Sequence, residues 1–162
     1  MAITVTVPTS AFQQTLDAEA KAVQQFIGLL QLEQTALSTG KTDELPALID
    51  KKAGLAARLN ALAAQRNQSL AEQGFAADLV GVESWCAKNP QEKNVLDAWQ
   101  RILSLASEAR ELNRLNGELI QMRMQYNAQA LEALQGGKDS FDLYGPDGQS
   151  KSPSKRRISD AV

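Results

Sequence analysis

The sequence contains no histidine, a single cysteine and few aromatic residues, and the first two of these shortages each exclude a class of chemistry. Without histidine the chain has no Ser-His-Asp or Cys-His nucleophile and no imidazole ligand for a metal ion. The one thiol, Cys86, cannot form an internal disulfide or a cysteine cluster for zinc. We therefore predict a protein that is not an enzyme and has no metal or cofactor site, and we expect no small-molecule substrate.

Signals for secretion and membrane insertion are also lacking. The first residues, MAITVTVPTSAF, contain no basic region followed by an apolar run, so they do not predict a signal peptide. No stretch approaches the roughly 18 apolar residues that a membrane-spanning helix needs. Together with the lone free cysteine, these absences predict a cytoplasmic protein.

The composition favours long helices that pack leucine and alanine. The 162 residues are 43% hydrophobic but only 5% aromatic, and 17 basic and 19 acidic residues give a formal net charge of −2. A charge so close to zero does not suggest a nucleic-acid partner. The length suits one domain, or one domain followed by a tail.

Two long helices joined by a tight turn are predicted first. Ser10 with Gln13 matches a capping box, and Gly40 is a typical helix stop. The second helix begins near Thr42 or Asp43 and ends at Gly74. Apolar residues recur at heptad spacing in both helices, with Lys52 and Arg66 as exceptions in the second. The short turn makes the two helices antiparallel.

The rest of the helical region consists of a connector and a third long helix. Residues 75–88 contain a short helix around Asp78 to Ala87, and Asn89-Pro90 resembles the start of a helix that runs to about Gln135. Its length of about 70 Å means that it either extends beyond its partners or breaks, with Asn116-Gly117 as the favoured break point. The apolar pattern shifts by one residue at the same place.

We accordingly predict an all-α protein, an elongated antiparallel bundle of three long helices with a short connector helix. Residues 1–137 form the helical bundle domain, and residues 138–162 form a C-terminal tail that is flexible or ordered by a partner. The tail carries a basic cluster, Lys155-Arg156-Arg157, which is more typical of a solvated surface than of a phosphate-binding site because no aromatic platform accompanies it.

The end of the third helix is unusually apolar around much of its circumference. These side chains either pack into the core of a bent helix or form a groove for a partner helix, a use that suits flexible methionine. Large apolar residues in the tail either pack back on the bundle or dock into a partner. The candidate partner-binding residues are Leu119, Ile120, Met122, Met124, Tyr126, Leu131, Leu134, Phe141, Leu143 and Tyr144.

The most specific part of the sequence is the segment LNRLNGELIQMRMQYNAQALEAL at residues 112–134, followed by LYGPDGQ at residues 143–149. With these motifs, the chain resembles the flagellar type III export chaperones of the FlgN family over about residues 10–149. The agreement in the first two helices is general to helical hairpins. The basic end of the chain matches no feature of the family.

The resemblance implies a cytoplasmic chaperone that binds the helical termini of the hook–filament junction (hook-associated) proteins. It implies delivery of these proteins to components of the flagellar export apparatus and places cargo binding in the C-terminal region. A self-associating coiled-coil scaffold or adaptor, in which the last helix pairs with its own copy, is the alternative. The sequence does not indicate which junction protein is preferred.

Overall fold

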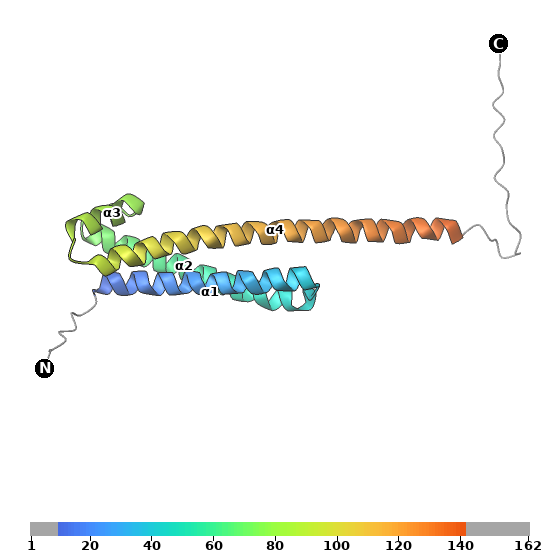
Figure 1. The fold of residues 1–162 in the computed structure, drawn as a ribbon, viewed down its shortest axis with the longest axis horizontal. Coiled ribbons are helices and arrows are strands. Elements are labelled where there is room, and N and C mark those ends of the chain that lie inside the picture. Colours follow the sequence, from blue (N-terminus) through green and yellow to red (C-terminus); the bar gives the residue numbers. More distant parts are fainter. Residues whose placement is uncertain (1–9, 142–162) are drawn as a thin grey trace, which may run out of the picture. The chain divides into compact units, whose positions relative to one another are not determined.

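The computed structural model describes residues 10–141, which form helices and turns without any strand (Figure 1). The elements are α1 (Ala11–Thr39), the short 3-10 helix η1 (Thr42–Glu44), α2 (Leu45–Glu72), α3 (Leu79–Lys88) and α4 (Lys93–Phe141). The chain divides into two units, Met1–Ile120 and Gln121–Val162, and α4 continues from the first into the second. The prediction of an all-α helical bundle is confirmed.

Local signals in the sequence set most helix ends. The Ser10 hydroxyl accepts a hydrogen bond from the Gln13 backbone N–H at 3.2 Å, and α1 ends at Gly40, whose φ of 79° is left-handed. Pro46 lies in the first turn of α2, where its missing N–H has no helical partner. Asp78 caps α3 by accepting a hydrogen bond from the Gly81 N–H at 2.9 Å.

Two expectations about α4 are wrong. The helix does not begin at Asn89-Pro90, because Asn89 instead caps α3, with its N–H donating to the carbonyls of Trp85 and Cys86. A turn closed by Glu92 N–H on the Asn89 carbonyl, at 2.9 Å, precedes the first helical residue, Lys93. The helix also ends at Phe141 rather than near Gln135. Of the two alternatives left open for its length, extension or a break, the break at Asn116-Gly117 does not occur.

The first unit is a three-helix bundle. Helices α1 and α2 run antiparallel side by side, and the first part of α4 packs on both (Figure 1). Near the start of α1, Phe12 lies 4.7 Å from Trp85 of α3 between ring centroids, within a core cluster to which all four helices contribute. A second cluster joins Ile27 and Leu30 of α1 to Ala109 of α4, with Leu59 of α2 packed against it. None of the described helices combines the length and apolar character that crossing a bilayer demands.

Candidate partner-binding surface

Eight of the ten candidate residues of the sequence analysis lie on the later part of α4. Glutamine, alanine, leucine and methionine dominate residues 119–136, and all four favour helix, which explains why α4 continues here without proline or a cap. Leu119 is half-buried at the end of the first unit. The others with described side chains are exposed: Ile120 40%, Met122 64%, Met124 66%, Tyr126 73%, Leu131 57% and Leu134 71%.

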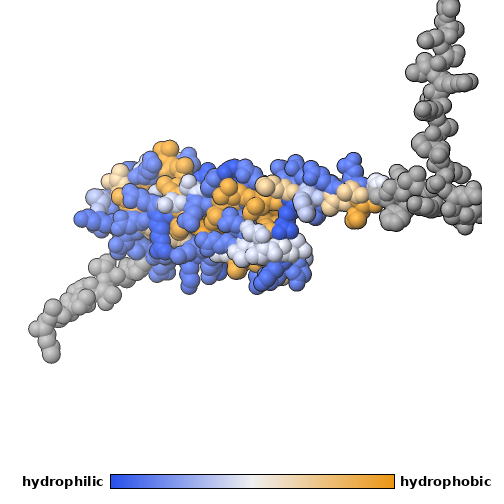
Figure 2. Space-filling model, turned by 45° about the vertical axis from the view of Figure 1, so that its right-hand side comes forward, coloured by the Kyte–Doolittle hydropathy of each residue, from blue (hydrophilic) through white to orange (hydrophobic). Residues whose placement is uncertain are grey.

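None of these exposed side chains belongs to either core cluster of the described residues. Large apolar side chains cost free energy when they stay in water, about 1.5–3 kcal/mol each relative to full burial. Apolar surface interrupts the hydrophilic surface of the described part of the chain (Figure 2). Of the three tail candidates, Phe141 is the last residue of α4, whereas Leu143 and Tyr144 lie outside the described residues, as does the basic cluster.

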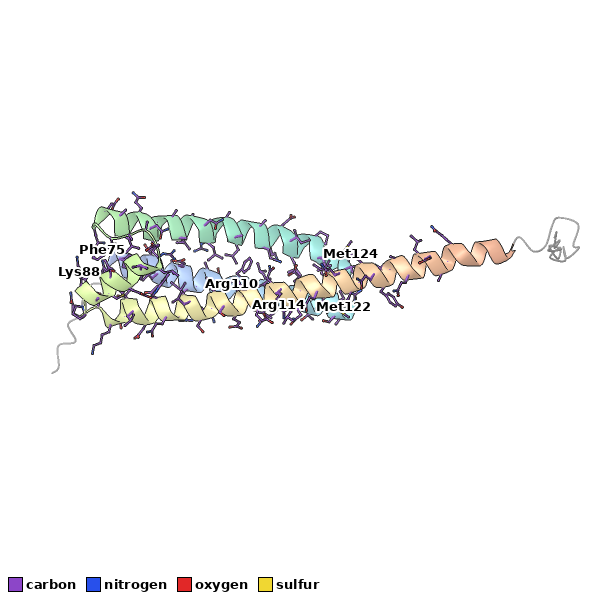
Figure 3. All side chains as sticks on the ribbon, turned by 90° about the horizontal axis from the view of Figure 1, so that it is seen from above. Phe75, Lys88, Arg110, Arg114, Met122 and Met124 are labelled. Atoms are coloured by element: carbon purple, nitrogen blue, oxygen red, sulfur yellow. The ribbon has the colours of Figure 1, made fainter. Side chains whose placement is uncertain are left out.

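The exposed apolar residues lie on two sides of α4. Met122 and Met124 are labelled in Figure 3, and a two-residue step on a helix turns a side chain by about 200°. The same arithmetic groups the other candidates. One group, the Met122 flank, consists of Leu119, Met122 and Tyr126; the second, the Met124 flank, consists of Ile120, Met124, Leu131 and Leu134. Gln121, Gln125 and Glu132 occupy the remaining arc, which we call the polar face.

The first unit shows how α4 packs where it is covered. Four side chains spaced seven residues apart are buried along one seam: Val95, Ile102, Ala109 and Asn116. The next two positions of that seam are Arg123 and Ala130, a charged and a small residue. Beyond Asn116 the large apolar residues therefore lie on either side of this line of positions and not on it, as the shift in the sequence pattern indicates.

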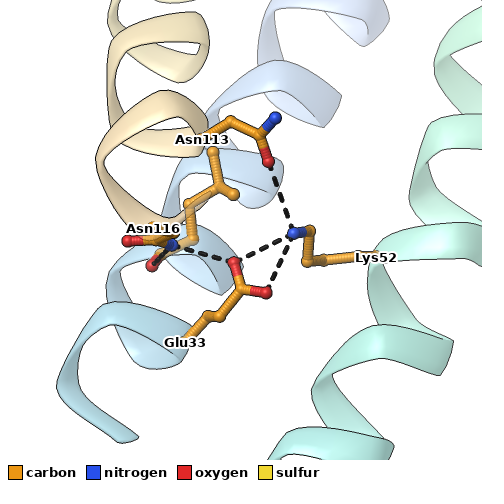
Figure 4. A network of polar contacts seen from close by, with 5 residues as sticks. Glu33, Lys52, Asn113 and Asn116 are labelled. Carbon is orange, nitrogen blue, oxygen red and sulfur yellow. Dashed lines mark hydrogen bonds and ion pairs between the residues drawn. The ribbon is translucent and has the colours of Figure 1, made fainter. Parts of the chain in front are cut away.

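A buried polar network fixes the end of the covered seam, and sequence reasoning missed it. The Asn116 side-chain amide, 1% exposed, donates to the Leu30 carbonyl and to Glu33 Oε2, both at 2.8 Å (Figure 4). Lys52 Nζ lies 2.9 Å from the same Oε2 atom and 3.5 Å from Asn113 Oδ1. Residues from all three long helices thus meet at this level, and Asn116 joins α4 to the hairpin instead of breaking the helix.

A second polar pair lies nearer the other end of the hairpin. Arg66 of α2 forms an ion pair with the buried Glu19 of α1, and its guanidinium lies 5.0 Å from the ring centroid of Trp99 on α4. Glu19 and Glu33 are two heptads apart on α1, and Lys52 and Arg66 are two heptads apart on α2 in the opposite order. These spacings match antiparallel pairing and explain the two basic residues in the apolar seam of the second helix.

Exposed ion pairs support α4 just before the candidate surface. Arg114 (Figure 3) contacts Glu111 at 2.7 and 3.0 Å and also pairs with Glu118 one turn further on. Its guanidinium holds the pKa of the Glu111 carboxyl below the ordinary value, and the two carboxylates raise the pKa of Arg114. Such pairs at helical spacing favour a continuous helix here. Among the described residues, no three cysteine or acidic side chains gather as metal ligands would.

Comparison with known proteins places this architecture in a family. The sequence model of the FlgN protein family matches residues 8–152. The flagella synthesis protein FlgN of Salmonella typhimurium is 28% identical over 137 residues, which cover 83% of this chain and 86% of that protein. Its namesake from Proteus mirabilis is 29% identical over 141 residues, or 86% and 89% of the two chains. The FlgN protein of Yersinia enterocolitica is 45% identical over 58 residues, only 36% of this chain and 39% of the relative. No solved structure matches the chain, but the family match spans all four helices, and the chain belongs to the FlgN family.

Proposed function

We propose that the protein is a cytoplasmic chaperone that binds the helical termini of hook–filament junction proteins through the exposed apolar residues of α4. It keeps these proteins soluble and delivers them to the flagellar type III export apparatus. Membership of the FlgN family supports a chaperone role in flagellum synthesis, and the relatives carry the words flagella synthesis in their names. Binding and delivery, with no catalytic step, are sufficient for this role.

The observation that carries the proposal is the unpartnered apolar surface between Ile120 and Leu134. Five of its six large apolar side chains are more than half exposed, and Ile120 is 40% exposed. An amphipathic helix from a partner would bury these groups on a helix surface without any need for a nucleotide or metal site. Methionine at two central positions allows the surface to adapt to more than one partner, because its side chain is unbranched and flexible.

The proposed binding residues are those of the two flanks. Leu119, Met122 and Tyr126 contribute one flank, and Ile120, Met124, Leu131 and Leu134 contribute the other. Phe141, Leu143 and Tyr144 are three further proposed binding residues. Burial of about 1,000–2,000 Å² would suit binding that is specific and can still be released.

The test is the binding of a purified hook–filament junction protein, measured by calorimetry. The variant with Met122→Asp and Tyr126→Asp should lose at least about 100-fold in affinity, because each carboxylate would be buried at the interface. The matched control carries Gln121→Asp and Gln125→Asp on the polar face and should bind like the unchanged chain. Equal circular dichroism spectra would show that all three proteins keep their helices.

A self-associating scaffold is the competing function, since a second copy could cover the same apolar surface. Light scattering of the chain alone and with the junction protein separates the two. A monomer that forms a complex with the junction protein supports the chaperone. A stable dimer or larger oligomer that ignores the junction protein would instead establish the scaffold.

A further inference from the structure

We propose that the later part of α4 holds two partner helices at the same time, one on the Met122 flank and one on the Met124 flank. This inference deepens the proposed function and rests on it, since it specifies what the chaperone binds. The occupant is a pair of amphipathic helices from the cargo, whose contact faces are apolar and nearly free of charge.

The width of the apolar arc is the first argument. At about 100° per residue, the candidates from Met122 on one edge to Met124 on the other span roughly 200° of the helix. The apolar stripe of an amphipathic helix is about 100° wide, and a two-stranded coiled-coil seam is narrower still. One straight helix packed along α4 would therefore leave one flank in water.

The covered part of the same helix supplies the second argument. Within the first unit, α4 already contacts two helices, because Asn116 bonds to α1 and Arg66 of α2 lies over Trp99. That contact uses the seam of Val95, Ile102, Ala109 and Asn116, with Ala98 and Leu105 packed beside it in the core clusters. Beyond Asn116 the seam positions carry Arg123 and Ala130, and the large apolar groups lie on both sides of them. Because large apolar side chains lie on both flanks, this part of α4 offers partner helices two separate lines of contact.

Charge defines the chemistry of the two partner helices. Residues 101–118 of α4 contain six charged side chains, Arg101, Glu108, Arg110, Glu111, Arg114 and Glu118, whereas residues 119–136 contain only Arg123 and Glu132. Glu132 belongs to the polar face and Arg123 to the seam, so neither flank carries a charge. A surface of this kind selects apolar and uncharged polar side chains, and added salt should change the affinity by less than about threefold.

Photo-crosslinking tests the inference with full-length chain and full-length junction protein. Benzoylphenylalanine replaces Met122, Met124 or, as the polar-face control, Gln125, and mass spectrometry identifies the crosslinked cargo segment. We expect Met122 and Met124 to capture two segments that do not overlap in the cargo sequence, and Gln125 to capture little. Capture of one and the same segment by both flanks, or capture by only one flank, would overturn the two-helix inference and leave the proposed chaperone function standing.

Affinity measurements provide a second readout with milder changes. Met122→Gln and Met124→Gln should each weaken cargo binding about tenfold, which corresponds to about 1.4 kcal/mol, while Gln125→Met should leave it unchanged. An effect confined to one methionine would contradict two contact lines. If no position captures cargo and neither methionine change alters its binding, the proposed function fails together with the inference. Crosslinks only between copies of the chain would point to self-association.

Discussion

Replacing Lys52 by methionine tests whether the buried polar network holds the bundle together. Lys52 Nζ lies 2.9 and 3.1 Å from the two oxygens of Glu33, a residue only 4% exposed. Methionine keeps most of the hydrocarbon stem but leaves the carboxylate without its cation. Breaking a fully buried ion pair costs about 3–5 kcal/mol. Because the Lys52 side chain is 19% exposed and Asn116 still donates to Glu33, we expect a loss of about 2–3 kcal/mol in the free energy of unfolding.

Urea unfolding followed by circular dichroism at the helical band measures this loss, which corresponds to a decrease of roughly 4–12 °C in Tm for a chain of this size. The neighbouring exposed Lys51→Met is the matched control and should change stability by less than about 0.5 kcal/mol. The double variant with Glu33→Leu and Lys52→Met should regain most of the stability, because no charge stays buried. A Lys52→Met protein as stable as the control, or a double variant less stable than Lys52→Met alone, would refute the reasoning.

Three further predictions concern the end of the bundle near α3. Gly81→Ala should destabilise the protein by about 3 kcal/mol, because an added Cβ would lie 1.6 Å from the Ala76 carbonyl oxygen; a melting temperature equal to that of the unchanged chain would contradict this contact. Leu16→Ala, at a site with no solvent exposure, should cost about 2–5 kcal/mol in urea unfolding, and a loss below 1 kcal/mol would show that the core refills the space. Burial, with a smaller effect of Glu83, raises the pKa of the Cys86 thiol, so its alkylation by iodoacetamide should rise with pH at higher values than in the urea-unfolded chain; coincident pH profiles would disprove the shift.

Local signals in the sequence were sufficient for the hairpin and for the short helix. The cap at Ser10 and the left-handed Gly40 act within one turn of the chain, so their patterns predict the ends of α1 correctly, and the short helix expected around Asp78 to Ala87 is α3, Leu79–Lys88. Asn89-Pro90 is a local signal that misleads, because Asn89 completes the hydrogen bonds at the end of α3 rather than beginning α4. The sequence pattern alone cannot decide whether such a residue ends one helix or begins the next.

Tertiary contacts account for the rest. Asparagine followed by glycine weakens a helix locally, yet Asn116 reaches Leu30 and Glu33 of α1, more than eighty positions earlier in the sequence, and these bonds outweigh its poor propensity. Lys52 and Arg66 were visible as exceptions to the apolar pattern, and matching them with acids two heptads apart on the first helix would have indicated their partners. For the candidate surface, the pattern gives the positions of the apolar groups, but only the fold shows that they are left uncovered.

The two ion pairs between α1 and α2 also exclude other alignments of the two helices. Sliding one helix along the other by seven positions, in either direction, would place the Glu33 carboxylate opposite Leu45 or Leu59 instead of Lys52. A shift of fourteen would pair only one of the two acids with a basic residue, because the position opposite the other acid would lie beyond an end of α2. Leucine repeats by themselves would tolerate such misalignment. The paired charges therefore restrict the hairpin to a single alignment, on which α4 can dock.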